Sequence, residues 1–551
     1  MRLKYKILFP SLIISLLSTF NVYAQMDNQR PNIVLILAED LSSRVGFAGD
    51  RLANTPNLDA IAEQSLIFDN AFTAAGVCAP NRSATIMGAH MQTLGTMHMR
   101  TSSADRLYGP GYKYEAVTPP NVKAFPELLR AAGYYVANNA KTDYQIGNPF
   151  TIWDETGSEA HWRKRPDGKP FFFYKTIGVT HESYTWPPSM NNGVESAQKD
   201  YKRNAEFDEG KTHFTDRSQI EIPPYYPDTE KVRETIGRQY DNVNMMDKMF
   251  GEVIKQLEED NLLDNTIIIW STDHGDGLPR AKRSLYDAGI KVPFFIRFPD
   301  GYRKNERTDE MISFVDLAAT ILSWAGAERP DFLQGHVIAG PSKDKEAEYI
   351  YAAADRFDGK PSKYKAVRSK RYKYIRNYMT DIPFYQHLAY RDNQPLMQSL
   401  WKGLEEGTLT QKQAAMFEPG PAEEFYDINN DPHEMNNIAD DEEFIPELNK
   451  HREAMDNWIA SGEDYSVMPE DELIESMWPG LVQPITLPVN FNMMNGKTFL
   501  ISDTEGASIG YRTIGQNEWK LYTSPLTLDE PIEAKAIRYG YKESEISSSS
   551  D

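Results

Sequence analysis

The sequence contains a single cysteine, Cys78, within a short segment whose residue types could hold an anion. Cys78 lies two residues before Pro80, a residue typical of the first turn of a helix, and Arg82 follows one turn after Cys78. The positive end of the helix dipole would act on a thiol or its oxidation product there, and the arginine could clamp an anion. A lone cysteine is otherwise a small buried apolar residue. The segment therefore has two interpretations, a reactive group beside an anion site or a core residue, and its surroundings favour the first.

Acidic residues follow two apolar runs of the sequence. Glu39 and Asp40 come directly after one run, and Asp273 and His274 come just after another. In parallel α/β sheets, ligands bind at the carboxyl ends of the strands. Carboxylates gathered at that edge predict a hard cation of the Ca²⁺ or Mg²⁺ type. Helix capping by Asp40 or Asp273 would explain each pair taken alone.

The segments that must position these residues alternate between buried strands and amphipathic helices. The predicted strands are Asn32–Ala38, Tyr134–Asn138, Phe171–Gly178, Thr266–Trp270 and Phe294–Phe298. The predicted helices are Pro56–Gln64, Phe125–Ala132, Thr229–Asp260 and Val315–Trp324. Strands that are apolar on both faces, with helices between them, indicate an α/β fold with a large mixed, mainly parallel sheet between helices.

Beyond about residue 345 the pattern changes. Residues 364–378 alternate as an antiparallel strand pair does, whereas 381–420 and 442–461 are expected to be helical, with Trp458 anchoring the second. Several short strands are expected between residues 498 and 546. These features predict a smaller subdomain with an antiparallel sheet and an appended small β domain.

The expected organisation has four parts. Three basic residues precede an apolar run at 7–20 and small residues at 22–24, which is typical of a cleaved signal peptide rather than a membrane anchor. We therefore expect a secreted or periplasmic protein. The boundaries are 1–24 for the signal peptide, 25–345 for the α/β domain, 346–478 for the C-terminal subdomain and 485–551 for the β domain.

The charge balance limits the partners. The 551 residues include 80 acidic and 59 basic side chains, and the formal net charge is −21. This excludes a nucleic-acid binder that relies on a global basic field. An anionic ligand must instead be bound by a local group of Lys and Arg. The one cysteine excludes an intrachain disulfide.

The segment Cys78-Ala79-Pro80-Asn81-Arg82 matches the Cys-x-Pro-x-Arg core of the type I sulfatase family, with Asn81 in place of the commonest Ser. The chain resembles this family, which belongs to the alkaline phosphatase-like superfamily, from residue 30 to about 475. Further blocks agree in order: Thr180-His181, Asp273-His274-Gly275, Lys282 with Tyr286-Asp287-Ala288-Gly289, Arg371-Tyr372-Lys373-Tyr374-Ile375 and Glu424-Phe425-Tyr426-Asp427. The tail resembles the small β domain of some chitobiase- and hexosaminidase-type enzymes, where packing is the favoured role.

The resemblance implies a modified nucleophile and a metal. Cys78 would be converted to formylglycine (3-oxoalanine) by a dedicated formylglycine-generating, sulfatase-maturing enzyme, and its hydrate would attack the substrate. One Ca²⁺, rather than Mg²⁺, would be bound. The metal ligands implied are Glu39, Asp40, Cys78, Asp273 and His274.

The resemblance also implies roles for four other residues. Arg82 would hold the formylglycine diol, and Lys141 and Lys282 would bind the sulfate oxygens. His181 would contact the sulfate or protonate the leaving group. These charges suit a sulfate ester, whose non-bridging oxygens must be neutralised.

The sequence departs from the family pattern in places. Where the family commonly has Lys-x-His, this chain has Lys141-Thr142-Asp143. Either Asp143 takes over the proton transfer, or His98 or His274 does, or Asp143 binds a substrate hydroxyl. Glu39 stands where the family most often has Asp, and His274 where it usually has Asn.

Two basic clusters could attract an anionic substrate, Arg280 with Lys282 and Arg283, and residues 163–165, although a solvated surface is the alternative for each. Residues 278–283 resemble a branch containing N-sulfoglucosamine sulfohydrolase-like enzymes and bacterial sulfatases of algal polysaccharides such as ulvan. We therefore expect a secreted sulfatase acting on a sulfated polysaccharide or its oligosaccharides, without a membrane anchor. The alternatives are a phosphodiesterase or phosphonate monoester hydrolase of the same superfamily, and a catalytically silent glycan-binding homologue.

Overall fold

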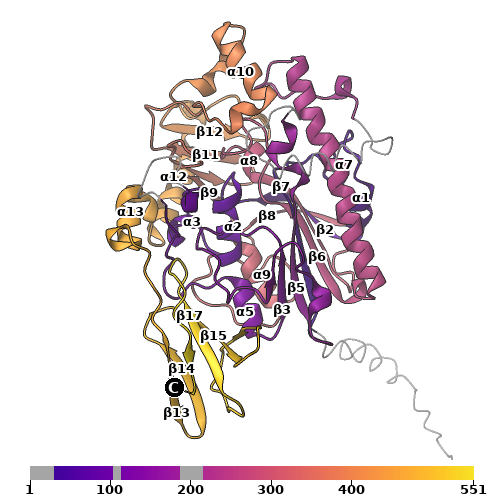
Figure 1. The fold of residues 1–551 in the computed structure, drawn as a ribbon. Coiled ribbons are helices and arrows are strands. Elements are labelled where there is room, and N and C mark those ends of the chain that lie inside the picture. The colour runs from indigo at the N-terminus through magenta and orange to yellow at the C-terminus, as the bar shows by residue number, and fades with distance from the viewer. Residues whose placement is uncertain (1–29, 104–112, 187–214, 551) are drawn as a thin grey trace, which may run out of the picture.

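Within residues 30–103, 113–186 and 215–550, which the computed structural model describes, eight strands form a central mixed sheet (Figure 1). In sheet order the strands are β4 (Glu155–Thr156), β3 (Tyr135–Asn139), β5 (Phe171–Ile177), β1 (Asn32–Ala38), β6 (Thr266–Thr272), β7 (Lys291–Arg297), β2 (Leu66–Phe72) and β8 (Glu306–Ser313). Neighbours from β4 to β6 are parallel, β7 is antiparallel to β6 and β2, and β8 is parallel to β2. The predicted α/β class with a mainly parallel sheet is confirmed. The predicted signal peptide lies outside the described residues.

Helices cover both faces of this sheet because β1 is apolar on both sides. Val34 and Ile36 pack with side chains of α1 (Pro56–Ala62) and of the long amphipathic α7 (Glu230–Glu259). Ile33 and Leu35 point the other way, into the core that holds α2 (Cys78–Met87), α5 (Phe125–Ala131) and α9 (Asp316–Trp324). Figure 1 shows α7 and α1 on one side of the sheet and α2, α5 and α9 on the other. The shorter helices are α3 (Met91–Leu94), α8 (Asp287–Ile290) and α13 (Glu470–Met477).

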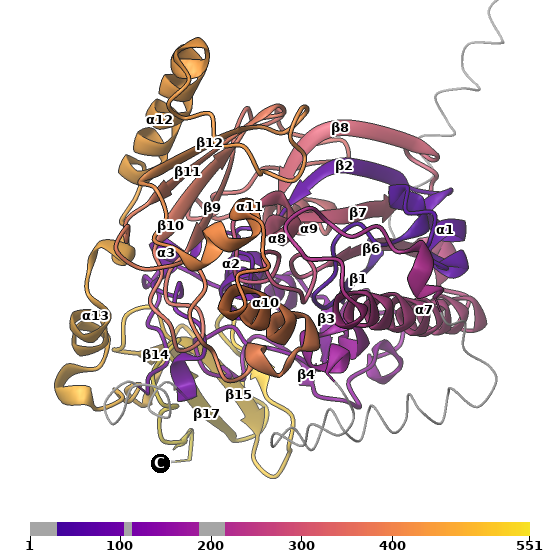
Figure 2. The ribbon, with the colours of Figure 1, turned by 90° about the horizontal axis from the view of Figure 1, so that it is seen from above.

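A second, antiparallel sheet lies beside the first, on the side of β8 (Figure 2). Its strands are β12 (Glu423–Asp427), β11 (Tyr372–Asn377), β10 (Tyr364–Arg368) and β9 (Ile350–Ala354), and α12 (Ile445–Ala460) packs on it. The expected antiparallel pair at 364–378 is therefore present as β10 and β11. Residues 381–420 are only partly helical, with α10 (Pro395–Glu405) and α11 (Gln411–Ala414) after an irregular stretch. Prolines and the lack of a helical apolar pattern before residue 395 account for the difference.

The C-terminal strands pack against α5. They are β13 (Val489–Met494), β14 (Lys497–Ser502), β15 (Ser508–Thr513), β16 (Lys520–Leu521), β17 (Ile532–Ile537) and β18 (Ser547–Ser548). The Tyr539 hydroxyl donates to Glu127 Oε2 at 2.7 Å, and the Lys123 ammonium donates to Ser508 Oγ at 2.7 Å. Among the described helices, none is both long and apolar enough to cross a membrane.

The buried carboxyl of Asp355, directly after β9, makes the stability of the fold depend on pH. Burial raises the pKa of its carboxyl from 3.8 to about 7, although Lys363 and Lys365 act to lower it. The folded chain therefore binds this proton more tightly than the unfolded chain, and the associated stability is lost as the pH rises through 7. We expect Asp355→Asn to stabilise the fold relative to wild type more at pH 8 than at pH 5, by about 2–3 kcal/mol, and to raise the melting temperature accordingly. A difference that does not change with pH, or an equal effect of the exposed control Asp331→Asn, would contradict this.

Candidate active site

The ends of β1 and β6 bring four predicted site residues together. The two strands are parallel neighbours with Ala38 opposite Thr272, so Glu39 and Asp40 emerge beside Asp273 and His274. The Asp40 backbone N–H donates to Asp273 Oδ1 at 3.1 Å. Glu39, Asp40, Asp273 and His274 are all buried. The predicted meeting of polar side chains at this sheet edge is thus present.

Three of these side chains form a group that fits a cation. Ligand atoms of Asp40, Asp273 and His274 lie within 4.8 Å of one another. Asp40 Oδ1 and His274 Nε2 face each other at 3.0 Å, yet neither makes a hydrogen bond of acceptable geometry in the described part of the chain. Buried polar atoms without partners are costly. A cation between these atoms would satisfy both, and the carboxylate oxygens suit a hard one.

The positive charge on His274 partly compensates these carboxylates. Burial lowers the pKa of this imidazole, but Asp273 and Asp40 outweigh burial and raise its pKa to about 10. Glu39 is held differently from the other predicted ligands, because its Oε1 accepts from Lys141 Nζ at 2.6 Å. Glu39 and Cys78 are not part of the three-residue group.

Cys78 is the first residue of α2, so the helix dipole acts at its side chain. Gly76 allows the loop before it to pack closely, since a Cβ there would lie 2.1 Å from the Ser284 carbonyl oxygen. Asn81 ties α2 to β6: its Oδ1 accepts from the Ala74 N–H at 3.0 Å and its Nδ2 donates to the Asp273 carbonyl at 2.6 Å. Cys78 is thereby fixed beside the acidic strand ends, and it interacts with the His274 side chain.

Arg82, one turn into α2, lies completely buried beneath this group. Its Nε is 3.4 Å from Asp273 Oδ2, and its other nitrogens reach Glu39 Oε1 at 3.5 Å and Tyr174 Oη at 3.1 Å. Burial lowers the pKa of a guanidinium, but Tyr174, Asp273 and Glu39 more than offset this and raise the pKa of Arg82. Arg82 is a permanent cation whose position is set by four neighbouring side chains, including Thr176.

Two lysines complete the cluster of charges. Lys282 Nζ donates to Asp40 Oδ2 at 2.6 Å and lies 3.1 Å from Glu182 Oε1, and Lys141 binds Glu39. Burial opposes their charge, but Asp40 and Glu182 raise the pKa of Lys282, and Cys78 and Glu39 raise the pKa of Lys141. Cys78 is close enough to both lysines to influence their charge.

His181 lies beside Lys282, just beyond β5. Its Nδ1 is 2.9 Å from Ser183 Oγ, whereas its Nε2 is 3.4 Å from Lys282 Nζ and 4.0 Å from Asp40 Oδ2. Burial and the charge of Lys282 lower the pKa of His181. Nε2 is thus the ring atom that faces the charged group.

A cleft of about 470 Å³ opens over Cys78. Its lining includes Lys141, Asp143 and His181, together with Arg100 and Tyr390, which the sequence did not indicate. Burial would raise the pKa of Asp143, but Lys141, Arg82 and Arg100 lower it, so this carboxylate is ionised. Of the three residues considered for the missing histidine's role, Asp143 is the one in the described lining.

Two other predicted site residues, Arg280 and His98, lie outside the described lining of this cleft. The Arg280 guanidinium donates to the backbone carbonyls of His433 and Glu434 at 2.9 and 2.6 Å and stacks on Tyr286. His98 is buried near Glu470 and Arg356, and burial lowers its pKa to about 4. Neither belongs to the described cleft lining. Folding thus buries Arg280 and His98 outside the described cleft lining, and their expected contact with substrate stays a prediction.

Arg283, also predicted to bind substrate, belongs to a chain of alternating buried charges. Its guanidinium donates to both carboxylate oxygens of Glu182, at 3.0 and 2.7 Å, and its Nε binds Asp358 at 2.5 Å. Glu182 continues the chain to Lys282, and Asp358 continues it to Arg100 at 2.6 Å. These cations lower the pKa of Glu182 to about 2 despite burial. Arg283 positions neighbouring charges instead of lining the cleft.

Sequence reasoning missed Glu182, Asp358, Arg100 and Tyr390. Glu182 directly follows His181, and this adjacency was the one available signal. Tyr390 comes from the irregular stretch before α10, where a helix was expected, and its ring packs on Trp186 at 4.6 Å between centroids. No sequence motif marks the loop that carries Glu182 or the irregular stretch that carries Tyr390.

Comparison with known proteins gives a consistent result. The family model described as Sulfatase matches residues 31–163 and 138–327, and the model described as N-sulphoglucosamine sulphohydrolase, C-terminal, matches residues 280–418. An ulvan-active sulfatase of Formosa agariphila is 38% identical over 94% of this chain and 90% of its own length. Human N-sulphoglucosamine sulphohydrolase is 23% identical over 82% of this chain and 95% of its own. A solved structure described as a complex with its substrate D-glucosamine-2-N,6-O-disulfate has a TM-score of 0.57 and 17% identity, covering 81% of this chain and all of the other.

Substitution of Arg283 tests its assignment to the buried charge chain. Arg283→Met leaves Glu182 and Asp358 without a shared cation, and removing one partner of a buried ion pair costs about 3–5 kcal/mol. We expect the melting temperature without substrate to fall by about 5 °C or more. The control Arg163→Met breaks an exposed pair with Asp260 and should cost at most about 1 kcal/mol. A variant that loses substrate affinity with an unchanged melting temperature would show that Arg283 contacts substrate after all.

Proposed function

This chain belongs to the sulfatase family and is a sulfuric ester hydrolase, and we propose that it removes sulfate groups from a sulfated polysaccharide of the ulvan type or its oligosaccharides. The observation that carries the proposal is the position of Cys78 at the start of α2. There it lines the same cleft as Lys141, interacts electrostatically with Lys141 and Lys282, and interacts with His274 of the group formed by Asp40, Asp273 and His274. This arrangement provides positive charge around a nucleophile, as a sulfate ester requires.

The nucleophile we propose is formylglycine made from Cys78 by a sulfatase-maturing enzyme during export. Once hydrated, this aldehyde supplies two hydroxyl groups: one attacks sulfur, and the other allows the aldehyde to re-form as sulfate leaves. Arg82 supports this chemistry because it is a fixed buried cation one turn along the same helix. Asn81 supports it by holding the start of α2 against β6.

The metal we propose is one Ca²⁺, held by Asp40, Asp273 and His274, with Glu39 and modified Cys78 as further ligands. The cation would supply charge for the oxygens of the sulfate group. The gathering of ligand atoms of Asp40, Asp273 and His274 within 4.8 Å supports a cation here, which would displace the proton of His274. The carboxylates favour Ca²⁺ over softer metals, whereas the His274 nitrogen is an unusual ligand for it.

Two residues are proposed to move protons. His181, in its imidazolium form, donates from Nε2 to the oxygen of the departing alcohol and returns to the neutral imidazole, which its lowered pKa favours; Ser183 occupies Nδ1, and Nε2 faces the charged cluster. Asp143 accepts the proton of the second hydroxyl as sulfate leaves, because it is ionised and lines the same cleft as Cys78. Lys141 and Lys282 bind the sulfate oxygens in both steps.

The substrate class follows from similarity and from charge. The ulvan-active relative covers almost the whole chain, which favours an algal polysaccharide over a small aryl sulfate. Export through the N-terminal segment would bring the enzyme to such a polymer outside the cytoplasm. The α/β domain at 25–345 and the C-terminal subdomain at 346–478 would form the catalytic unit, and the β domain at 485–551 would support it by packing on α5.

The modification of Cys78 is tested by mass spectrometry and sulfate release. In protein produced together with its maturation enzyme, we expect the tryptic peptide with Cys78 to carry the aldehyde in place of the thiol. We expect Cys78→Ala to lose at least about 10³-fold in kcat on ulvan oligosaccharides, since the nucleophile is gone. An unmodified thiol in such protein would favour a silent glycan-binding homologue.

The same assay separates sulfatase from phosphodiesterase activity. A phosphodiester and a phosphonate monoester are run beside the sulfated oligosaccharides on one sample of wild-type protein. Faster turnover of either phosphorus ester would contradict the proposed substrate class.

Metal content and chelation test the cation site. We expect about one Ca²⁺ per wild-type chain, activity that is lost on exhaustive chelation, and recovery on adding Ca²⁺ in preference to Mg²⁺. Asp273→Asn should lower the metal content well below one, because it removes a buried carboxylate from the group. The exposed control Asp300→Asn should leave the content unchanged. Full activity in metal-free protein, or an equal metal content in Asp273→Asn, would rule out this site.

A further inference from the structure

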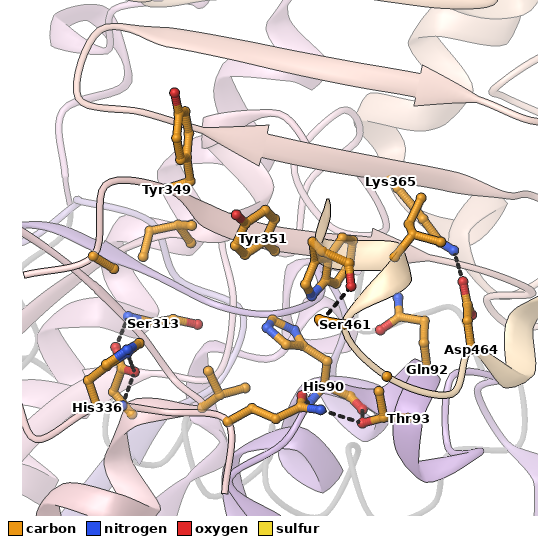
Figure 3. Close-up of a pocket in the computed structure, with 18 of the residues that line it drawn as sticks. His90, Gln92, Thr93, Ser313, His336, Tyr349, Tyr351, Lys365, Ser461 and Asp464 are labelled. Carbon is orange, nitrogen blue, oxygen red and sulfur yellow. Dashed lines mark hydrogen bonds and ion pairs between the residues drawn. The ribbon is translucent and has the colours of Figure 1, made fainter. Parts of the chain in front are cut away.

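A second cavity, of about 300 Å³, lies at the other end of α2 from Cys78 (Figure 3). Because α2 has ten residues, its ends lie about 15 Å apart. The cavity is formed by the start of α3, by β9 and by the end of α12, and its described lining shares no residue with the cleft over Cys78. Its volume falls at the lower end of the range for small-molecule sites.

Several residues that line this cavity carry buried polar atoms without a partner in the described part of the chain. They are His90 Nδ1, both amide atoms of Gln92, and Ser313 Oγ. His90, Gln92 and Ser313 are 7%, 3% and 4% exposed, and all three line the cavity. Figure 3 shows them on its lower side, opposite Tyr351. Because native structures satisfy almost all such groups, these atoms point to a polar ligand.

The cavity offers mainly neutral groups, since most of its charged side chains are already paired and Glu463 is exposed and accepts from the Tyr465 hydroxyl. Lys365 forms an ion pair with Asp464, and His336 lies 3.6 Å from Asp316. Burial lowers the pKa of His90 to about 4, so this imidazole is neutral. An imidazole, an amide and a hydroxyl each both donate and accept hydrogen bonds. This combination matches hydroxyl groups better than a sulfate or a carboxylate, which would need a cation.

Aromatic side chains form the opposite wall. Tyr351 and Trp458 are stacked with ring centroids 4.9 Å apart, and His90 meets Trp458 edge-on at 5.0 Å. Both aromatic residues are half-buried, so part of their surface remains open. Aromatic faces beside hydrogen-bonding groups suit a ring with apolar C–H faces and polar edges, which describes a pyranose.

We propose that this cavity binds an uncharged pyranose unit of the polysaccharide, away from the sulfate group that is hydrolysed. The choice of a sugar over another uncharged ring rests on the proposed function, whereas the existence of the site rests on the partnerless atoms and the rings. Gln92 is the residue that specifies the ligand, because its amide contributes both a donor and an acceptor.

Gln92→Leu tests the proposal in protein that cannot turn over substrate. The probe is chemically desulfated ulvan oligosaccharide, titrated into Cys78→Ala protein and followed by calorimetry and ligand-observed NMR. We expect binding that weakens at least 10-fold when Gln92→Leu is added. The melting temperature should stay unchanged or rise, because the amide has no partner to lose. The matched control Gln516→Leu, at an exposed amide of the C-terminal strands, should leave binding unchanged.

Other outcomes overturn the proposal. The proposal is wrong if the desulfated oligosaccharide does not bind, or if it binds equally with and without Gln92→Leu. It is also wrong if only the sulfated form binds. Displacement of the oligosaccharide signal by indole but not by free monosaccharides would show a site for an apolar aromatic ligand. A separate assay measures sulfate release from a small aryl sulfate by the Gln92→Leu single variant. This assay distinguishes failure of the second site from failure of the proposed function. Normal release with unaltered oligosaccharide binding removes only the second site, whereas no release by wild-type protein from sulfated ulvan oligosaccharides removes the proposed function.

Discussion

The structure depends on the compensation of buried carboxylates at one edge of the central sheet. Glu39, Asp40 and Asp273 cannot stay buried and ionised unless positive charge lies against them. Arg82, Lys141 and Lys282 supply that charge from three different segments, and each is in ion-pair distance of at least one of the carboxylates. The charges that would bind a sulfate group are therefore the same ones that hold the segments of the site together.

The compensation extends outward in one direction, from Lys282 through Glu182 and Arg283 to Asp358 and Arg100. Each inner member of this chain is buried and touches charges of opposite sign on both sides, so none can be replaced alone without leaving a bare charge. Arg100 ends the chain at the cleft, with its side chain 40% exposed. This chain of ion pairs thereby links the buried charges to the rim of the cleft, where a substrate would bind.

The sequence alone predicts those elements and site residues that a local pattern of apolar and polar residues determines. The apolar run at 32–38 marks β1, the periodicity of 229–260 marks α7, and the polar residues after the runs mark the metal group. β8 was missed because its first half is exposed and carries charged residues, so it lacks the pattern of a buried strand. The Glu182–Arg283 and Arg283–Asp358 pairs join residues far apart in the chain, and only the folded topology brings them together. Arg280 and Arg283 look alike in sequence as basic surface residues, and burial alone reveals that they are internal.

The acidic net charge sets a condition on how a polyanion can bind. A chain with a formal charge of −21 repels a sulfated polymer at a distance, but this repulsion is screened beyond about 8 Å at physiological salt. Attraction must then come from contact, and the cations of the cleft are already shared with carboxylates. A second site for an uncharged sugar would add contact that salt does not weaken. Tethering the polymer at a second point, near the other end of α2, would raise the local concentration of its sulfate groups at Cys78 without requiring a basic surface.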